Sequence, residues 1–142
     1  MTEPIPHPDR RDAFVVPPPA SAGRMLARGA ARRCPRCGGG GLFRAWFAMR
    51  PDCPRCGLVF AHEEGYWTGA MMVNLAVTEI LFLATFVVFL VATWPDVPWV
   101  SLLVLVVMVN VAVPVVFYPF SKTLWVAGDL AFRARDRDPR AR

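Results

Sequence analysis

The apolar residues of this chain gather in two long runs in its second half. The first run covers residues 71–93, the second covers residues 100–120, and only a few polar side chains interrupt them. A helix needs about 20 apolar residues to cross a bilayer, and both runs meet that requirement. The short segment 94–99 between them permits only an antiparallel arrangement. The pattern therefore predicts a hairpin of two transmembrane helices, because no other part of the chain could cover two such helices as a soluble core would.

The segments that flank this hairpin are more polar. Residues 61–70 are expected to form a junction before the first span, and residues 134–142 a charged tail. Residues 121–133 carry apolar side chains at helical spacing, which predicts an amphipathic helix in the membrane interface. Its apolar stripe consists of Leu124, Trp125, Gly128, Ala131 and Phe132, and its other side carries Lys122, Asp129 and Arg133. The alternative is a simple continuation of the second span into the cytosol.

Positive charge is absent from the hairpin. The chain has 16 Lys and Arg residues and a net charge of +5, yet none of the 16 lies between Gly57 and Ser121. Since Lys and Arg collect on the cytoplasmic side of membrane spans, we expect both termini in the cytoplasm and the turn outside. Residues 1–20 contain no apolar leader segment, which agrees with this orientation. Four tryptophans are expected to anchor the interfaces, Trp94 and Trp99 on the outer side and Trp67 and Trp125 on the inner side.

Residues 1–30 are predicted to be a disordered, basic and Pro-rich tail. Prolines prevent regular helix and sheet hydrogen bonding there, and little apolar surface is available for burial. Arg24, Arg28 and Arg32 are four residues apart, so a short basic helix over residues 24–33 is an alternative. Such a segment suits a solvated surface, anionic lipid or nucleic acid. Its closeness to the spans favours lipid, and the lack of a base-reading motif argues against nucleic acid.

All four cysteines of the chain lie in two matching motifs. Cys34-Pro35-Arg36-Cys37-Gly38 recurs as Cys53-Pro54-Arg55-Cys56-Gly57, with 15 residues between Cys37 and Cys53. Cytoplasmic thiols stay reduced, so this spacing indicates metal ligands in preference to disulfides. Four thiolates suit tetrahedral Zn²⁺, and iron in the same geometry is the main competitor. Residues 31–60 are therefore predicted to form a zinc-ribbon-like module in which Cys34, Cys37, Cys53 and Cys56 bind the metal.

The rest of this module is predicted to support the metal site. A glycine follows each motif's second cysteine, where it tolerates positive φ and lets backbone N–H groups approach the sulfur atoms. A module of about 27 residues buries too little surface to fold alone, so metal binding is expected to provide its folding free energy. Three apolar segments are expected to be short strands whose aromatic faces cover the metal, namely Leu42-Phe43, Trp46-Phe47 and Leu58-Val59-Phe60.

The chain lacks the patterns that are typical of enzymes. Four thiolates close the coordination shell of zinc and leave no position for a catalytic water. The sequence also has no nucleophile–base pair, Gly-rich phosphate loop or paired carboxylate site. We therefore predict a non-enzymatic protein with structural zinc and no catalytic residues.

Three polar residues inside the predicted spans are candidates for function. Asn74 and Glu79 lie in the first span, and Asn110 lies in the second. At about 1.5 Å per residue, Glu79 and Asn110 reach nearly the same depth in an antiparallel hairpin. A charge at that depth costs at least roughly 2.5–3.5 kcal/mol. We therefore expect a neutral Glu79 that is hydrogen-bonded within the hairpin, or a Glu79 that docks on a partner's polar group. An ion relay is disfavoured because two helices cannot enclose a pathway without oligomerisation.

Together these motifs resemble the bacterial family known as domain of unknown function 983. The resemblance implies a small protein of the bacterial inner membrane with a pair of cysteine motifs and two spans. Some members lie beside genes for cytochrome oxidase assembly, which implies a role in assembly. The resemblance covers roughly residues 32–132 and rests on the two cysteine motifs, on Gly41-Leu42-Phe43-Arg44 and on Tyr118-Pro119-Phe120-Ser121-Lys122-Thr123-Leu124-Trp125.

Two functional interpretations stay open. The first is a non-enzymatic, membrane-anchored zinc ribbon that docks on a membrane protein complex, such as a respiratory oxidase during assembly, or on a second copy of the chain. The second is a metal- or redox-handling membrane protein that uses labile cysteine thiolates together with Glu79. The two differ in metal affinity, since a structural site resists chelators that would empty a transfer site.

Overall fold

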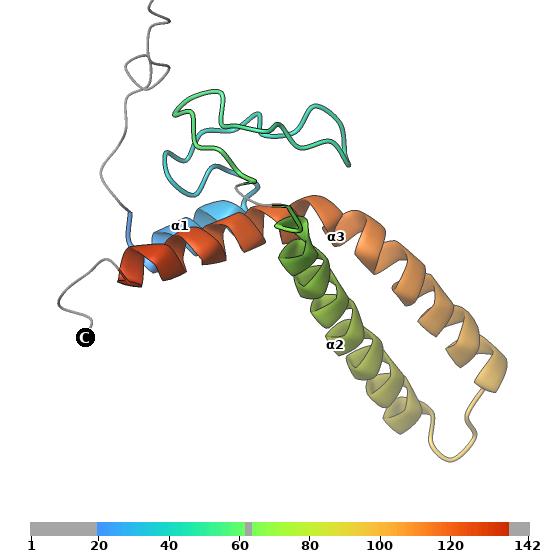
Figure 1. Cartoon of the computed structure of the whole chain (residues 1–142). Helices are drawn as coiled ribbons and strands as arrows, with labels where there is room; N and C mark the ends of the chain where they lie inside the picture. The colour runs from blue at the N-terminus through green and yellow to red at the C-terminus, as the bar shows by residue number, and fades with distance from the viewer. Residues whose placement is uncertain (1–19, 62–63, 137–142) are drawn as a thin grey trace, which may run out of the picture.

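The computed structural model describes residues 20–61 and 64–136, and this part of the chain contains three helices. They are α1 (Ala22–Ala30), α2 (Trp67–Thr93) and α3 (Trp99–Asp136). Residues 31–61, called the cysteine module from here on, form no helix and separate α1 from α2 (Figure 1). The expectations for residues 1–19 and 137–142 lie outside the described residues.

α2 and the first part of α3 form the predicted antiparallel hairpin (Figure 1). α2 is 27 residues long, and both helices are long and apolar enough to cross a membrane. In the apolar 18-residue stretch that identifies each helix as a candidate span, only 6% is buried inside the protein. A core helix of a soluble protein would be mostly covered, so these two helices are candidate membrane spans.

α3 continues without interruption through residues 121–133, where the sequence predicted a separate helix. It bends, however, and its last part leaves the direction of the hairpin and runs beside α1 (Figure 1). The bend is caused by Pro114 and Pro119, which lie inside the helix. Each proline lacks an N–H group, and its ring displaces the carbonyl four residues earlier. One bent helix therefore covers both predicted segments, and its bend at Pro114 and Pro119 lies close to the predicted boundary between residues 120 and 121.

Helix α1 contradicts the prediction that all of residues 1–30 form a disordered tail. Its residues Met25 and Gly29 are buried, and the Thr123 hydroxyl of α3 donates to the Gly29 carbonyl at 2.7 Å. A Cβ atom at Gly29 would lie 2.8 Å from the Ala127 side chain and 2.9 Å from the Thr123 carbonyl oxygen, so a glycine is needed for this close approach. A helix this short is unstable alone in water. Packing on α3 is what stabilises it.

The cysteine module lies over α1 and the bent part of α3, and the hairpin extends from α3 in the opposite direction (Figure 1). The expected strands are reduced to isolated bridges in the described residues, which pair Phe43 with Met49 and Asp52 with Val59. The module's core contains the cysteines and further apolar side chains, and Val126 of α3 belongs to the same core. The module is therefore packed on α3 as well as on itself.

We expect Gly29→Ala to destabilise the packing of α1 on α3. The added methyl group would meet its neighbours at 2.8 and 2.9 Å, and overpacking of this kind costs about 1–3 kcal/mol. Gly23→Ala is the matched control, because a Cβ there has nothing within 4 Å and alanine favours a helix by up to about 1 kcal/mol. Thermal unfolding should show a lower midpoint for Gly29→Ala and an unchanged or higher midpoint for Gly23→Ala. Equal midpoints for the two variants would contradict the close packing.

Candidate metal centre

Each cysteine motif folds into a tight turn that brings its two thiols to one side. The Gly38 N–H donates to the Cys34 carbonyl at 2.8 Å, and the Gly57 N–H donates to the Cys53 carbonyl at 2.9 Å. Both glycines have positive φ angles, 74° and 64°, a conformation that favours glycine because it has no Cβ. The role predicted for these two glycines is confirmed.

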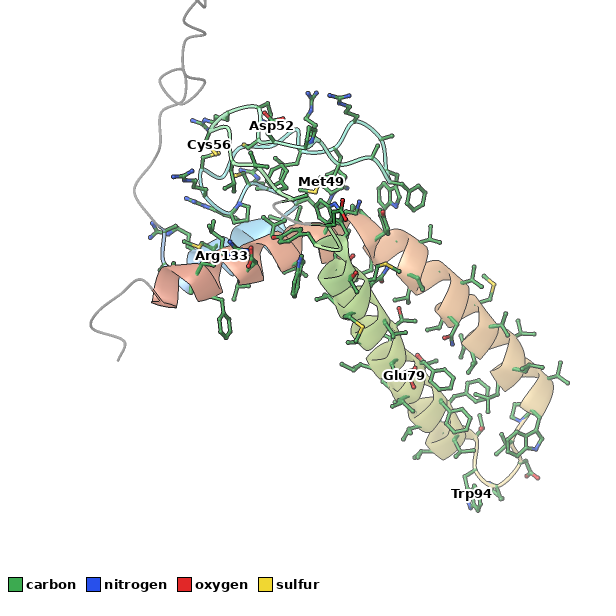
Figure 2. The ribbon with its side chains drawn as sticks, in the orientation of Figure 1. Met49, Asp52, Cys56, Glu79, Trp94 and Arg133 are labelled. Atoms are coloured by element: carbon green, nitrogen blue, oxygen red, sulfur yellow. The ribbon has the colours of Figure 1, made fainter. Side chains whose placement is uncertain are left out.

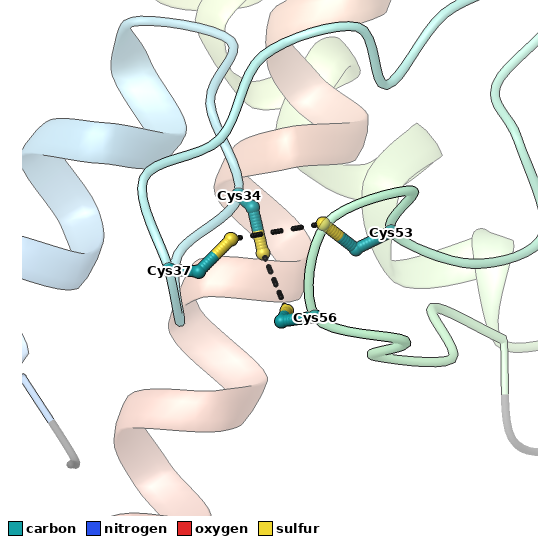
Figure 3. A group of neighbouring side chains, drawn as sticks. All are labelled: Cys34, Cys37, Cys53 and Cys56. Carbon is teal, nitrogen blue, oxygen red and sulfur yellow. Dashed lines mark hydrogen bonds between the residues drawn. The ribbon is translucent and has the colours of Figure 1, made fainter. Parts of the chain in front are cut away.

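The two turns face each other and gather four sulfur atoms into one cluster (Figure 3). The Sγ atoms of Cys34 and Cys56 lie 3.8 Å apart, and those of Cys37 and Cys53 lie 3.7 Å apart. All four lie within 4.8 Å of one another. A tetrahedral ion with metal–sulfur bonds of about 2.3 Å holds its ligands about 3.8 Å apart, whereas a disulfide requires about 2.05 Å. The cluster therefore fits a metal ion, and the four predicted ligands meet at one site.

The candidate metal site is closed to solvent on most sides. Cys34 and Cys53 are fully buried, Cys56 is 3% exposed and Cys37 is partly buried. Three of the four thiols are thus shielded from solvent, and Cys37 lies on the more exposed side of the cluster.

The aromatic cover of the site differs from the prediction. Phe60 is fully buried in the core around the cysteines, and Phe43 packs against that core from its edge. Trp46 and Phe47, which were expected to cover the metal, are 42% and 55% exposed. These two side chains therefore do not cover the metal site.

Burial changes the acidity of the thiols. It raises the pKa of Cys34 far above its usual range and the pKa of Cys56 to about 11. Burial also acts to raise the pKa of Cys37, but the Gly39 N–H at 3.3 Å and the neighbouring thiols donate to its sulfur and lower that pKa overall. Cys34 and Cys56 are therefore neutral thiols at pH 7 in the metal-free protein, and a metal ion must displace their protons.

Arg28 connects α1 to the first cysteine motif. Its Nη1 atom donates to the Arg36 carbonyl at 2.8 Å and to the Pro35 carbonyl at 3.3 Å. Arg28 thus steadies the turn that carries Cys34 and Cys37. From the sequence, the basic segment that contains this residue was expected to contact lipid. Its hydrogen bonds to carbonyls seven and eight residues away could not be predicted, because such contacts leave no recognisable sequence pattern.

The sequence model of a family described as "Protein of unknown function (DUF983)" matches residues 43–129, more than half of the chain. The chain belongs to the DUF983 family. The resemblance seen in the sequence is thereby confirmed. The DUF983 match includes the second cysteine motif, both helices of the hairpin and the bend of α3, whereas Cys34 and Cys37 precede it. Searches of curated proteins and of solved structures returned no match.

The DUF983 match also contains the three polar residues of the spans, which the structure keeps apart. Asn74 donates to the Pro114 carbonyl of α3 at 3.1 Å. Glu79 and Asn110 are both exposed on the hairpin, and Asn110 donates to the Val106 carbonyl of its own helix. The hydrogen bond expected for Glu79 within the hairpin is not formed by the described residues.

The direction of Glu79 follows from helix geometry. Asn74 and the buried Thr78 are four residues apart and share the face of α2 that meets α3. Glu79 lies about 100° further around the helix, and this rotation turns it outward. Matching depth along the hairpin therefore did not imply contact across it.

The four predicted tryptophan anchors lie at the two ends of the hairpin. Trp94 and Trp99 are 74% and 65% exposed at its turn, where Figure 2 labels Trp94. Trp67 begins α2 at the opposite end. Trp125 lies near that end too, and its ring packs so closely over Gly69 that a Cβ there would overlap it. Trp125 therefore also joins α3 to α2.

Acid should release the metal from the cysteine cluster. Each ligand binds as a thiolate, so protons compete with the metal, and the raised pKa values of Cys34 and Cys56 strengthen this competition. We expect the metal affinity of the reduced protein to fall by at least about tenfold for each pH unit below neutrality. Competition with a chromophoric chelator over a pH series measures it. An affinity independent of pH would be incompatible with thiolate ligands.

Proposed function

We propose that this protein is a non-enzymatic zinc-ribbon protein of the bacterial inner membrane that docks on a membrane protein complex. Its DUF983 membership, cysteine cluster and two candidate spans describe a metal-binding membrane protein in coarse terms. The identity of the metal, the orientation in the membrane and the partner are the proposed parts.

Zinc is the metal that suits the site best. Sulfur separations of 3.7 and 3.8 Å agree with tetrahedral coordination, which Zn²⁺ adopts with four cysteines. The burial of Cys34, Cys53 and Cys56 favours a closed structural site over a labile one. This burial supports the zinc ribbon over a metal- or redox-handling protein, and bound zinc would hold the two cysteine turns together.

We expect the purified protein to carry one zinc ion per chain and Cys37→Ser to lose most of it. Removal of one of four thiolates opens the site, so the cysteine module should also become sensitive to proteases. Ala48→Ser, an exposed position of the same module, is the control that should retain its zinc. Elemental analysis by mass spectrometry provides the measurement. Stoichiometric iron with a one-electron redox spectrum would refute the assignment of zinc.

The charge distribution supports an orientation with the cysteine module on the cytoplasmic side. No Lys or Arg lies between Gly57 and Ser121. Lys122 lies at the end of the hairpin that carries the module, with its Nζ atom 4.5 Å from the ring centroid of Trp67 and 4.9 Å from that of Tyr118. Cationic and aromatic side chains together are typical of a membrane interface, and the basic side faces the cytoplasm.

The proposal of a membrane partner rests on the exposed carboxyl group of Glu79. The hydrogen bond from Asn74 to Pro114 sets the register of the hairpin and places Glu79 close to the level of Asn110, in the middle of the spans. A charge at this depth costs at least roughly 2.5–3.5 kcal/mol in lipid. A polar or basic group of a partner protein would remove that cost. The family resemblance makes a respiratory oxidase under assembly the suggested partner.

Glu79→Leu should therefore abolish association with the partner and leave zinc content and membrane insertion unchanged. Ile80→Leu is the matched control, since Ile80 is the next residue and 64% exposed. Tagged chains would be purified from membranes in mild detergent, and the accompanying proteins compared by quantitative mass spectrometry. A second copy of the chain as partner would appear as an oligomer that Glu79→Leu dissociates. Equal recovery of every partner with both variants would overturn the proposal.

A further inference from the structure

A turn in the cysteine module presents two exposed aromatic side chains. The Arg44 N–H donates to the Ala48 carbonyl at 2.8 Å, and the Ala48 N–H donates to the Ala45 carbonyl at 3.1 Å. These bonds close a tight turn whose central residues are Trp46 and Phe47, 42% and 55% exposed. Residues 44–48 are called the tip loop below.

The tip loop rests on the second span. The Trp46 Nε1 atom donates to the Val115 carbonyl at 2.8 Å, and the Phe47 ring meets the Tyr118 ring edge to face at a centroid distance of 5.1 Å. Pro119 has no N–H to offer to the Val115 carbonyl, so the indole replaces the missing helical donor. In Figure 1 the teal part of the module accordingly extends over α3.

This hydrogen bond sets the depth of the tip loop relative to the span. Val115 lies five residues before Phe120, the end of the predicted second span, which corresponds to about 7.5 Å along a helix. Interfacial segments bury their apolar side chains about 5–10 Å into the boundary between headgroups and acyl chains. The tip loop therefore lies at the depth of an interfacial anchor.

One arginine holds the tip loop in this position. The guanidinium carbon of Arg32 lies 5.0 Å from the Trp46 ring centroid, 5.2 Å from that of Phe43 and 5.5 Å from that of Phe120. These are cation–π distances. They join the end of α1, the tip loop and the second span through a single side chain, so the exposed aromatic pair is positioned by several contacts.

The surroundings of the tip loop suit a phospholipid surface. Val115, whose carbonyl accepts the hydrogen bond from Trp46, is itself 48% exposed, so the aromatic pair adjoins the apolar surface of the span. Arg44 is exposed in the loop, and Lys122 lies just after the end of the span. Tryptophan is suited to this boundary because its ring is apolar while its N–H is hydrogen-bonded. Cationic side chains beside it favour anionic headgroups.

We propose that the tip loop inserts into the phospholipid interface beside the second span, so that the cysteine module contacts the membrane directly. Acyl chains would cover Phe47, and anionic headgroups would approach Arg44. This inference rests on the proposed membrane placement of the hairpin. It adds a lipid contact that the four tryptophan anchors of the spans do not include.

Photo-crosslinking of the full chain in vesicles of phosphatidylethanolamine and phosphatidylglycerol tests this contact. One variant carries p-benzoylphenylalanine in place of Phe47. A control carries it at Val59, which is 50% exposed and forms a backbone bridge with Asp52. Figure 2 shows Asp52 on the side of the module away from the helices. A second control carries it at Val104, which is 57% exposed within the second span. Intact-protein mass spectrometry detects lipid adducts, and metal content reports whether each variant is folded.

We expect lipid adducts at positions 47 and 104 and none at position 59. Adducts at position 104 without adducts at position 47 would overturn the inference and leave the membrane placement of the hairpin intact. Equal labelling at positions 47 and 59 would also overturn it, because it would show non-specific contact. Absence of lipid adducts at position 104 would refute the membrane placement and the inference together. In native membranes, an adduct at position 47 with a protein in place of lipid would identify a partner surface and refute lipid insertion.

Discussion

Carbonyl groups at the bend of α3 connect the cysteine module to the hairpin. Pro119 deprives the Val115 carbonyl of its helical donor, and the indole of Trp46 provides a substitute, while Asn74 of α2 donates to the neighbouring Pro114 carbonyl. An unsatisfied carbonyl in an apolar environment costs several kcal/mol, so the hydrogen bond from Trp46 stabilises the bend. The bend in turn directs the last part of α3 sideways, where α1 and the cysteine module pack on it (Figure 1).

The cysteine module and the hairpin consequently behave as one folded unit. A metal bound by four cysteines would close the module from within. From outside, Val126 of α3 enters its core and Arg28 of α1 holds its first turn. A small metal module on a flexible tether would show none of these contacts. Any partner that docks on the spans therefore also meets the module in a defined orientation.

Much of this architecture could be predicted because it depends on neighbours in the chain. The length and apolarity of the two runs indicate the spans, and the spacing of Cys34, Cys37, Cys53 and Cys56 indicates one tetrahedral site. The positive φ of Gly38 and Gly57 follows from the same motifs. Helix α1 could not be predicted with equal security, since its sequence is basic and short and its stability comes from the contact of Gly29 with α3.

The sequence by itself determined the two apolar helices, the four cysteines of the candidate metal site and the membership in the DUF983 family. Only the tertiary structure decided which side chains the helix faces bring together. The Trp46 indole donates to a carbonyl 69 residues away and does not cover the metal site. Arg28 donates to a carbonyl of the first cysteine motif, where the sequence had suggested contact with lipid. Glu79 faces outward because Asn74 and Thr78 occupy the face of α2 that meets α3. The physical reason is common to all three, since the rotation of a helix and the partner of a donor depend on packing between segments distant in the chain.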